Sequence, residues 1–444
     1  MVLADLDSLR DSFAGTLLLD NDEGFSAYVY PIGAPGLIAR PTNVDDVTSA
    51  LKYAVDHELP VSIRSGGHSG GGWTSIAGGL VLDMSGFDRV DVAGTTVTVG
   101  AGATWGAVAS ALAPHGLALT SGDTASVGVG GLTLGGGVGW IVRKLGLALD
   151  NLTSATIVTA TGKSVAASAT ENADLFWAIR GGGGNFGVAT EFTFEALPLD
   201  GVVHGIISLA TDDLAALLRA YRDVMRDAAE ELNATFLLMP PMGPEIPGGP
   251  QIHVVWAGSD EAAAMSAIQP LLDIPGVTGH DVVPKAYHDV LDEPEPPPAG
   301  VPMPMIVGNN GWAPDFSDEA IAAVATMVGA IEAPVLMIRY LRGAFNRVPA
   351  DATAFAWRDA ETLVIAVAFL PPDSPPAALE AIDAAWAPVA EYTRGTYGNF
   401  VGYAGEKAVA LMYPEATRAR LAAVKRAWDP GNLFNQNQNI EPGD

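Results

Sequence analysis

The chain has 444 residues, which is too long for one ordinary hydrophobic core and predicts two domains. Its 51 acidic and 23 basic residues give a formal net charge of −28, and such a surface repels nucleic acid and anionic lipid heads. Because it contains no cysteine, disulfides, thiolate catalysis and cysteine-based metal sites are excluded. The N-terminus lacks a basic region followed by a long apolar run, so we expect a cytoplasmic protein without a signal peptide or membrane span.

The N-terminal part of the chain predicts short helices and strands in mixed order. Residues 3–18 read as a helix, and a second helix capped within 42–46 runs to His57 with its apolar residues on one face. A helix from Trp105 to His115 should end at Gly116. Alternating apolar residues predict strands over 60–64, 80–84, 89–92, 96–99, 155–159 and 191–195.

The character of the sequence changes near Pro198. Apolar strands are expected over 205–209, 235–238, 252–256 and 363–369. Alanine-rich helices are expected between them, over 212–231, 318–332 and 376–392. The fold class is therefore α+β, because the segments are too short and too mixed for a TIM barrel.

One glycine-rich segment follows the strand over 60–64 and carries a histidine. It reads Arg64-Ser65-Gly66-Gly67-His68-Ser69 and continues with three more glycines. Glycines let the backbone approach a ligand closely, and consecutive N–H groups can bind an anion such as a pyrophosphate. The spacing is not that of a Walker loop and fits a Rossmann loop poorly. A glycine-rich hairpin with an incidental histidine is the alternative.

Further motifs follow in order along the chain. They are the glycine-rich blocks over 121–140 and 175–188, the segment Tyr397-Gly398-Asn399, and the C-terminal run from Asp429 to Ile440. Together with the first block, they resemble the berberine-bridge-enzyme-like branch of the vanillyl-alcohol-oxidase/p-cresol-methylhydroxylase (PCMH) flavoproteins. The resemblance covers nearly the whole chain and is strongest over 35–195 and 393–441.

This resemblance implies a two-domain PCMH-type FAD-binding fold. An FAD-binding domain is expected over 1–197, and a substrate-binding domain, an antiparallel sheet covered by helices, over 198–392. Residues 393–444 should return to the FAD-binding domain.

The resemblance also implies that FAD is linked covalently through its 8α-methyl carbon to His68. That bond needs a neutral imidazole, and an unperturbed histidine pKa of about 6.5 leaves the ring mostly neutral at pH 7. Many relatives add a second link from a cysteine, but Thr124 stands at that position here. We therefore expect a link through His68 only, with a lower reduction potential than in doubly linked relatives. Noncovalent FAD packed beside His68 is the alternative.

Other cofactor-binding residues follow from the matching motifs. They are Arg64, Ser65, Gly66, Gly67, Ser69, Gly122, Asp123, Ser126, Val127, Gly130, Gly131, Leu134, Gly137, Gly187, Val188, Tyr397, Asn399, Asn437 and Gln438. Val129 should lie near the reactive face, where a modest side chain leaves room for O2. A plain turn is the alternative for the segment around Gly187.

Tyr397 is the candidate catalytic residue, as general base or as a substrate-positioning group. A phenol has a pKa near 10, so a base at neutral pH needs a lowered pKa; a purely structural tyrosine is the alternative. Residues 339–341 and 346–358 resemble the strands that face the flavin, which makes Tyr340, Phe355 and Trp357 the candidate substrate pocket. Relatives often have histidine where Trp357 stands, which favours an apolar or stacking wall.

Two further sets of residues bear on proton transfer and on metal binding. Glu361 is a possible acidic base, although an ordinary strand residue explains it better. The other histidines show no metal-ligand spacing, so we expect no metal site.

The expected function is that of an FAD-dependent oxidase. A hydride would leave a C–H bond of an alcohol, amine or sugar hemiacetal, and O2 would reoxidise the flavin. The partners would be a small-molecule substrate and O2, with no nucleic acid and no membrane. A dehydrogenase with another electron acceptor and a flavin-binding protein without turnover are the alternatives.

Overall fold

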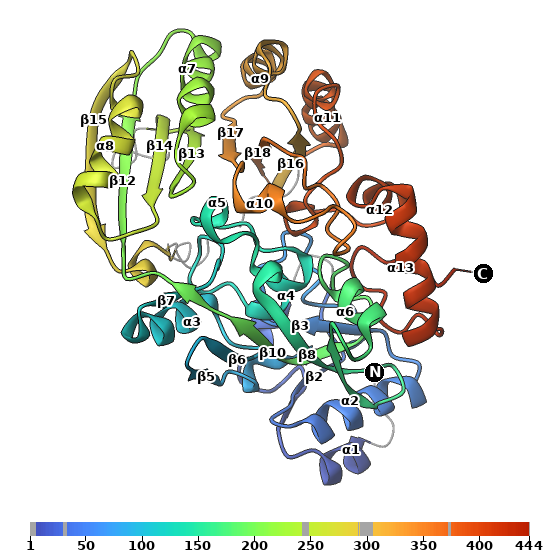
Figure 1. Ribbon diagram of the computed structural model, residues 1–444. Helices are drawn as coiled ribbons and strands as arrows, with labels where there is room; N and C mark the ends of the chain where they lie inside the picture. The colour runs from blue at the N-terminus through green and yellow to red at the C-terminus, as the bar shows by residue number, and fades with distance from the viewer. Residues whose placement is uncertain are drawn as a thin grey trace.

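The computed structural model describes residues 6–29, 33–241, 248–291, 293, 305–371 and 374–443. These residues form the expected α+β fold, in which helices cover several mainly antiparallel sheets (Figure 1). None of the helices in this part of the chain is both long and apolar enough to cross a lipid bilayer.

The N-terminal region builds a four-stranded sheet in which β2, β4 and β3 run parallel and β1 pairs antiparallel with β2. Its strands are β1 (Thr16–Leu18), β2 (Leu37–Arg40), β4 (Leu80–Asp83) and β3 (Val61–Arg64). Helices α1 (Leu6–Ser12) and α2 (Val44–Asp56) accompany it, and the Asn43 side chain caps α2 by accepting from the Asp46 N–H at 2.9 Å. The prediction of a single helix over 3–18 is wrong, because Thr16–Leu18 forms a strand that pairs with β2.

A five-stranded antiparallel sheet follows, in the order β5-β6-β10-β8-β9. Its strands are β5 (Val90–Ala93), β6 (Thr96–Gly100), β10 (Val188–Glu195), β8 (Leu152–Val158) and β9 (Ser164–Ser168). The helices of this region are α3 (Trp105–Leu112), α4 (Val129–Gly135), α5 (Val142–Leu145) and α6 (Ala173–Ile179), and β7 (Leu117–Ala118) pairs with β11 (Leu197–Pro198). Trp105, Phe192 and Phe194 are fully buried in the core between these elements.

A seven-stranded antiparallel sheet forms the upper part of the molecule in Figure 1, in the order β15-β12-β14-β13-β17-β18-β16. Its strands are β12 (Val202–Leu209), β13 (Leu232–Met239), β14 (Gly249–Trp256), β15 (Val277–Lys285), β16 (Met305–Ala313), β17 (Val335–Tyr340) and β18 (Thr362–Leu370). Helices α7 (Leu214–Asp227), α8 (Glu261–Leu272), α9 (Asp318–Ala330) and α11 (Pro376–Ala390) bury their apolar residues against one face.

The two faces of this sheet have different neighbours, as strand alternation requires. In β17, Ile338 and Tyr340 belong to the core shared with the helices, whereas Met337 and Arg339 point toward the glycine-rich part of the chain. The sheet therefore presents one row of side chains to the site described below.

The segment 346–358 does not form the expected strand. It contains the end of α10 (Ala344–Arg347) and then irregular backbone. The Asn346 side chain closes this loop by donating to the carbonyls of Arg358 at 2.7 Å and Ala360 at 2.9 Å. Arg358 is buried against Asp150 at 2.6 Å, so side chains supply interactions that a strand would have taken from a neighbour.

The C-terminal helices α12 (Glu406–Met412) and α13 (Glu415–Trp428) return to the glycine-rich part, on the right of Figure 1. Leu421, Val424 and Ile440 join the core that contains Trp105. The domain limits at residues 197 and 392 stay a prediction.

Candidate cofactor and active site

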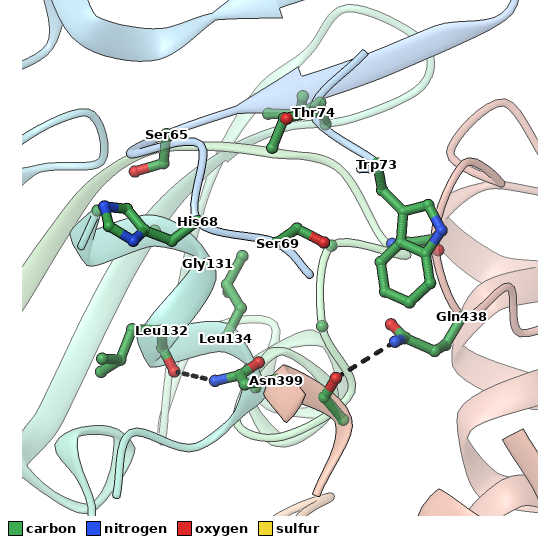
Figure 2. A pocket seen from close by; sticks show the side chains of 18 of the residues that line it. Ser65, His68, Ser69, Trp73, Thr74, Gly131, Leu132, Leu134, Asn399 and Gln438 are labelled. Carbon is green, nitrogen blue, oxygen red and sulfur yellow. Dashed lines mark hydrogen bonds between the residues drawn. The ribbon is translucent and has the colours of Figure 1, made fainter. Parts of the chain in front are cut away.

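A cavity of about 310 Å³ lies where the glycine-rich segments meet the C-terminal segment. Four stretches line it: the loop after β3, the residues around α4, the loop after α6, and C-terminal segments near Tyr397 and Gln438 (Figure 2). In Figure 2, His68 lies on one side of the cavity, Trp73 and Gln438 on the other, and Asn399 near α4. Motifs far apart in the sequence thus meet at one site.

The His68 imidazole is open to this cavity and is held by Ser126. Its Nε2 lies 2.9 Å from Ser126 Oγ. Burial is the main cause that lowers the His68 pKa; the charge of Arg64 acts in the same direction and that of Glu293 opposes it. The ring is therefore neutral at pH 7, and in the tautomer that donates from Nε2 to Ser126 the lone pair lies on Nδ1.

The loop that carries His68 presents free backbone donors. No acceptor among the described residues takes the N–H groups of Gly66, Gly67, His68 and Ser69, all of which line the cavity. Gly66 must be glycine, because a Cβ would lie 2.3 Å from the backbone nitrogen of Gly128. A row of such donors suits an anion.

At two glycines that line the cavity, a Cβ would make no close contact with the rest of the protein. Gly131 lies within α4, and a Cβ there would meet no protein atom within 4 Å. A Cβ on Gly184 would meet only the Asn437 side chain, at the ordinary contact distance of 3.7 Å. Both line the cavity, so the missing side chains leave space there.

Polar side chains at the cavity are also left without partners. Thr74 Oγ1 and Asn437 Oδ1 are buried and have no hydrogen-bond partner among the described residues. Asn185 next to them is satisfied: it donates to Gly182 O at 2.9 Å and accepts from Ile440 N at 3.0 Å. Buried unpartnered polar atoms are rare in folded proteins, so these two fit a polar ligand such as a dinucleotide.

Tyr397 is buried and its hydroxyl oxygen accepts three hydrogen bonds. The donors are Gly137 N at 2.9 Å, Val138 N at 3.4 Å and Asn399 Nδ2 at 2.9 Å. Burial raises the Tyr397 pKa and outweighs these donors and the charge of Arg339, which lower it. Tyr397 is therefore a neutral phenol, and the lowered pKa that a general base needs is not found.

Most of the expected cofactor residues line the cavity. They are Ser65, Gly66, Gly67, His68, Ser69, Gly122, Asp123, Val127, Gly130, Gly131, Leu134, Gly187, Tyr397, Asn399, Asn437 and Gln438. Arg64, Ser126, Gly137 and Val188 do not.

The residues outside the lining set have other positions. The Arg64 guanidinium lies 4.6 Å from the centre of the Tyr28 ring, Ser126 and Gly137 act through His68 and Tyr397, and Val188 is buried in β10. Val129 is also fully buried and does not line the cavity. The first turn of α4 directs it into the core around Trp105, and its expected place near the reactive face stays a prediction.

The three candidate substrate-pocket residues do not line the cavity either. Tyr340 points to the helix-covered side of its strand, where its hydroxyl donates to Glu361 Oε1 at 3.2 Å. Phe355 packs edge-on against Tyr397 with ring centres 6.3 Å apart, and Trp357 Nε1 donates to Met412 O at 2.7 Å. Phe355 and Trp357 therefore support the wall around Tyr397 from behind.

Glu361 lies outside the cavity and is fully buried. Burial alone would raise its pKa, but hydrogen bonds from Arg226 and the Phe316 N–H lower the pKa overall. Arg226 holds both carboxylate oxygens, at 2.7 and 2.9 Å. Glu361 is thus a structural carboxylate on the far side of the sheet.

Sequence reasoning missed several residues that build the site. Trp73, Thr74, Met412 and Tyr413 line the cavity. Asn310 on β16 holds Tyr397, because its Oδ1 accepts from the Tyr397 N–H at 2.6 Å. Strand alternation next to Tyr340 could have identified Arg339, which forms an ion pair with the cavity residue Asp123.

The sequence matches two protein-family models and a relative of nearly the same length. Residues 35–168 match the model of the FAD binding domain family, and residues 397–441 match the family described as berberine and berberine like. The chain is 30% identical to the FAD-linked oxidoreductase YvdP of Bacillus subtilis over 96% of this chain and 98% of that protein.

Solved structures of oxidases share the fold. The structure of 6-hydroxy-D-nicotine oxidase from Arthrobacter nicotinovorans superposes with a TM-score of 0.85 and 28% identity, over 97% of this chain and 99% of that one. Glucooligosaccharide oxidase from Acremonium strictum, described with a 6-S-cysteinyl, 8α-N1-histidyl FAD, gives a TM-score of 0.85 and 25% identity over 98% and 99%. The chain is thus an enzyme of the berberine-bridge-enzyme-like branch of the PCMH-type FAD-linked oxidoreductases.

Proposed function

We propose that the enzyme carries FAD in this cavity through a single covalent bond from His68 Nδ1 to the flavin 8α-methyl carbon. The observation that carries the proposal is the His68–Ser126 contact of 2.9 Å, which engages Nε2 of a side chain that lines the cavity and leaves Nδ1 as the ring nitrogen available for the bond. The lowered pKa of His68 supports a neutral nucleophilic ring. Thr124 and the absence of cysteine leave no thiol for a second link.

The remaining groups would bind the cofactor without covalent bonds. The free N–H groups from Gly66 to Ser69 suit the pyrophosphate, and Thr74 and Asn437 offer polar atoms that lack protein partners. Gly131 and Gly184, which have no side chains, would leave space in the cavity for the cofactor. The protein's contribution is therefore close backbone approach rather than positive charge, in keeping with its acidic composition.

The proposed reaction is the oxidation of a C–H bond in an alcohol, amine or sugar hemiacetal. FAD, when bound, supplies the acceptor for the hydride. Tyr397 is a neutral phenol whose oxygen already accepts hydrogen bonds from three N–H groups. These bonds orient its O–H group, so Tyr397 fits a role in positioning the substrate rather than the role of a base. The names of the two solved relatives support an amine or a sugar as substrate and O2 as electron acceptor.

The test is anaerobic reduction followed by mixing with air. The purified enzyme is mixed with 6-hydroxy-D-nicotine, glucooligosaccharides or benzyl alcohol, and flavin absorbance is followed. We expect bleaching with at least one probe, then rapid recovery and H2O2 formation when air is admitted. Bleaching with slow recovery in air would favour the dehydrogenase, and no bleaching with any probe would favour a binding protein without turnover.

A further inference from the structure

The cavity contains one carboxylate among the described residues that line it, that of Asp123. Asp123 follows Gly122 in the second glycine-rich block, and its side chain is 28% exposed. The other ionisable groups of the lining are His68, Tyr397 and Tyr413. Asp123 is thus the carboxylate that the described lining presents to the cavity.

The partners of the Asp123 carboxylate leave one oxygen available. Oδ2 forms an ion pair with Arg339 Nη2. Within the described part of the chain, Oδ1 has Thr124 Oγ1 as its one partner, at 3.4 Å, which is long for an O–H···O bond. One oxygen is therefore anchored, and the other is free to accept a proton.

Arg339 reaches Asp123 from the seven-stranded sheet and is 3% exposed. Its Nε lies 3.2 Å from Met337 Sδ, and its guanidinium lies 5.8 Å from the centre of the Trp140 ring. These contacts fix the guanidinium, so the pair joins the sheet to the cavity wall at a defined position. A buried arginine of this kind fixes the orientation of the carboxylate it binds.

The other ionisable groups in the lining are poorly suited to take a proton from the substrate. His68 is held by Ser126 and is assigned above to the cofactor. Burial raises the pKa of Tyr397 and of Tyr413, so both hold their protons at neutral pH. Glu361 lies on the opposite side of the sheet.

We propose that Asp123 is the catalytic base of this enzyme and that Arg339 is its positioning residue. The inference rests on the proposed function. The substrate C–H bond would lose its hydrogen with the bonding electron pair, as a hydride, for which the FAD would supply the acceptor. The O–H or N–H proton of the substrate moves to Asp123 Oδ1, and a C=O or C=N bond forms from the electron pair that the proton leaves. Two electrons are thus removed from the substrate and one proton is left on Asp123.

The test compares Asp123→Asn and Asp123→Ala with the wild type, using whichever probe named above bleaches the wild-type flavin. For Asp123→Asn we expect kcat to fall by about 100-fold or more with KM changed only a few-fold, because general-base catalysis contributes roughly 10²- to 10⁴-fold. Among the described residues, Arg339, His253 and Tyr287 interact electrostatically with Asp123, and all three remain in place in this variant.

Chemical rescue distinguishes a catalytic base from a residue with a purely structural role. Added formate should restore part of kcat in Asp123→Ala, and it should have no effect on the wild type or on Asp123→Asn. Covalent flavin absorbance and the thermal midpoint report whether the variants fold and load. Because removal of Asp123 leaves Arg339 buried and unpaired, the double variant Asp123→Asn with Arg339→Gln provides a second test if the single variants unfold.

Two results would overturn the inference in distinguishable ways. A loaded Asp123→Asn variant that keeps wild-type kcat would refute the role of Asp123 and leave the proposed function standing. A wild-type enzyme whose flavin none of the probes reduces would overturn both. The matched control is Glu230→Gln. Glu230 is exposed and forms a surface ion pair with Arg347, so this variant should behave as wild type.

Discussion

Gly131 leaves open space on the side of α4 that lines the cavity. A glycine inside a helix costs about 1 kcal/mol relative to alanine, and no protein atom would contact a Cβ at this position. The same reasoning applies to Thr74, whose buried hydroxyl lacks a partner in the described structure. The fold alone would favour other residues at both positions.

Substitution Gly131→Ala should therefore reduce flavin loading without unfolding the protein. The added methyl group projects into the cavity, so we expect the flavin-to-protein ratio to fall several-fold while the circular dichroism spectrum stays unchanged. The matched control is Gly329→Ala in α9, which is also helical with open space at its Cβ but lies away from the cavity. Equal loading of the two variants would contradict the placement of the cofactor.

At the scale of helices, strands and loops, short sequence motifs predicted the elements of the site more accurately than the elements packed around it. The histidine loop, the helix α2 and the strand β10 follow from short-range patterns that a sequence displays directly. Strand β17 also formed, but its two faces are both buried, so polarity did not reveal that Arg339 rather than Tyr340 points toward the site.

Long-range packing explains why the segment 346–358 does not form the expected strand. The loop around Asn346 depends on hydrogen bonds from its side chain to the carbonyls of Arg358 and Ala360. Such contacts join residues that carry no shared local signal, and short-range patterns do not encode them.

Helix α13 fixes the C-terminal segment through a buried lysine. Lys425 Nζ donates to Asn185 O, Phe434 O and Asp429 Oδ2 at 2.8, 2.9 and 2.6 Å, and its side chain is fully buried. Substitution Lys425→Met should lower the free energy of unfolding by about 3–5 kcal/mol, because it leaves Asp429 buried without its cation. Denaturant unfolding measures this loss.

The exposed pair Arg394–Asp359 provides the comparison for Lys425. Removing Arg394 should cost at most about 1 kcal/mol, because surface ion pairs are screened by water. A similar small loss for Lys425→Met would show that α13 does not anchor the C-terminal segment.

At the scale of the whole molecule, the seven-stranded sheet meets the glycine-rich part through His204 and Trp140, whose ring centres lie 6.4 Å apart. Burial, with the charges of Lys285 and His253, lowers the His204 pKa to about 4, although Asp281 acts in the opposite direction. The folded state therefore binds fewer protons here than the unfolded chain, whose histidine pKa is about 6.5.

The contribution of His204 to stability should be fully present above pH 6.5 and be lost as the pH falls toward 4. Because the ring is partly exposed, we discount the full linkage value and expect a loss of about 1–2 kcal/mol across this range. His204→Gln lacks the titration, so its stability relative to the wild type should rise by that amount as the pH is lowered. Parallel pH profiles of the unfolding free energy for the two proteins would contradict it.

The central claim is that His68 carries the flavin, and absorbance of acid-precipitated protein tests it most directly. We expect the yellow flavin spectrum to stay with the wild-type precipitate and to be absent from that of His68→Ala, and the peptide that contains His68 to carry the added flavin mass. Flavin released into the supernatant of the wild-type protein, or retained by the His68→Ala precipitate, would contradict the account.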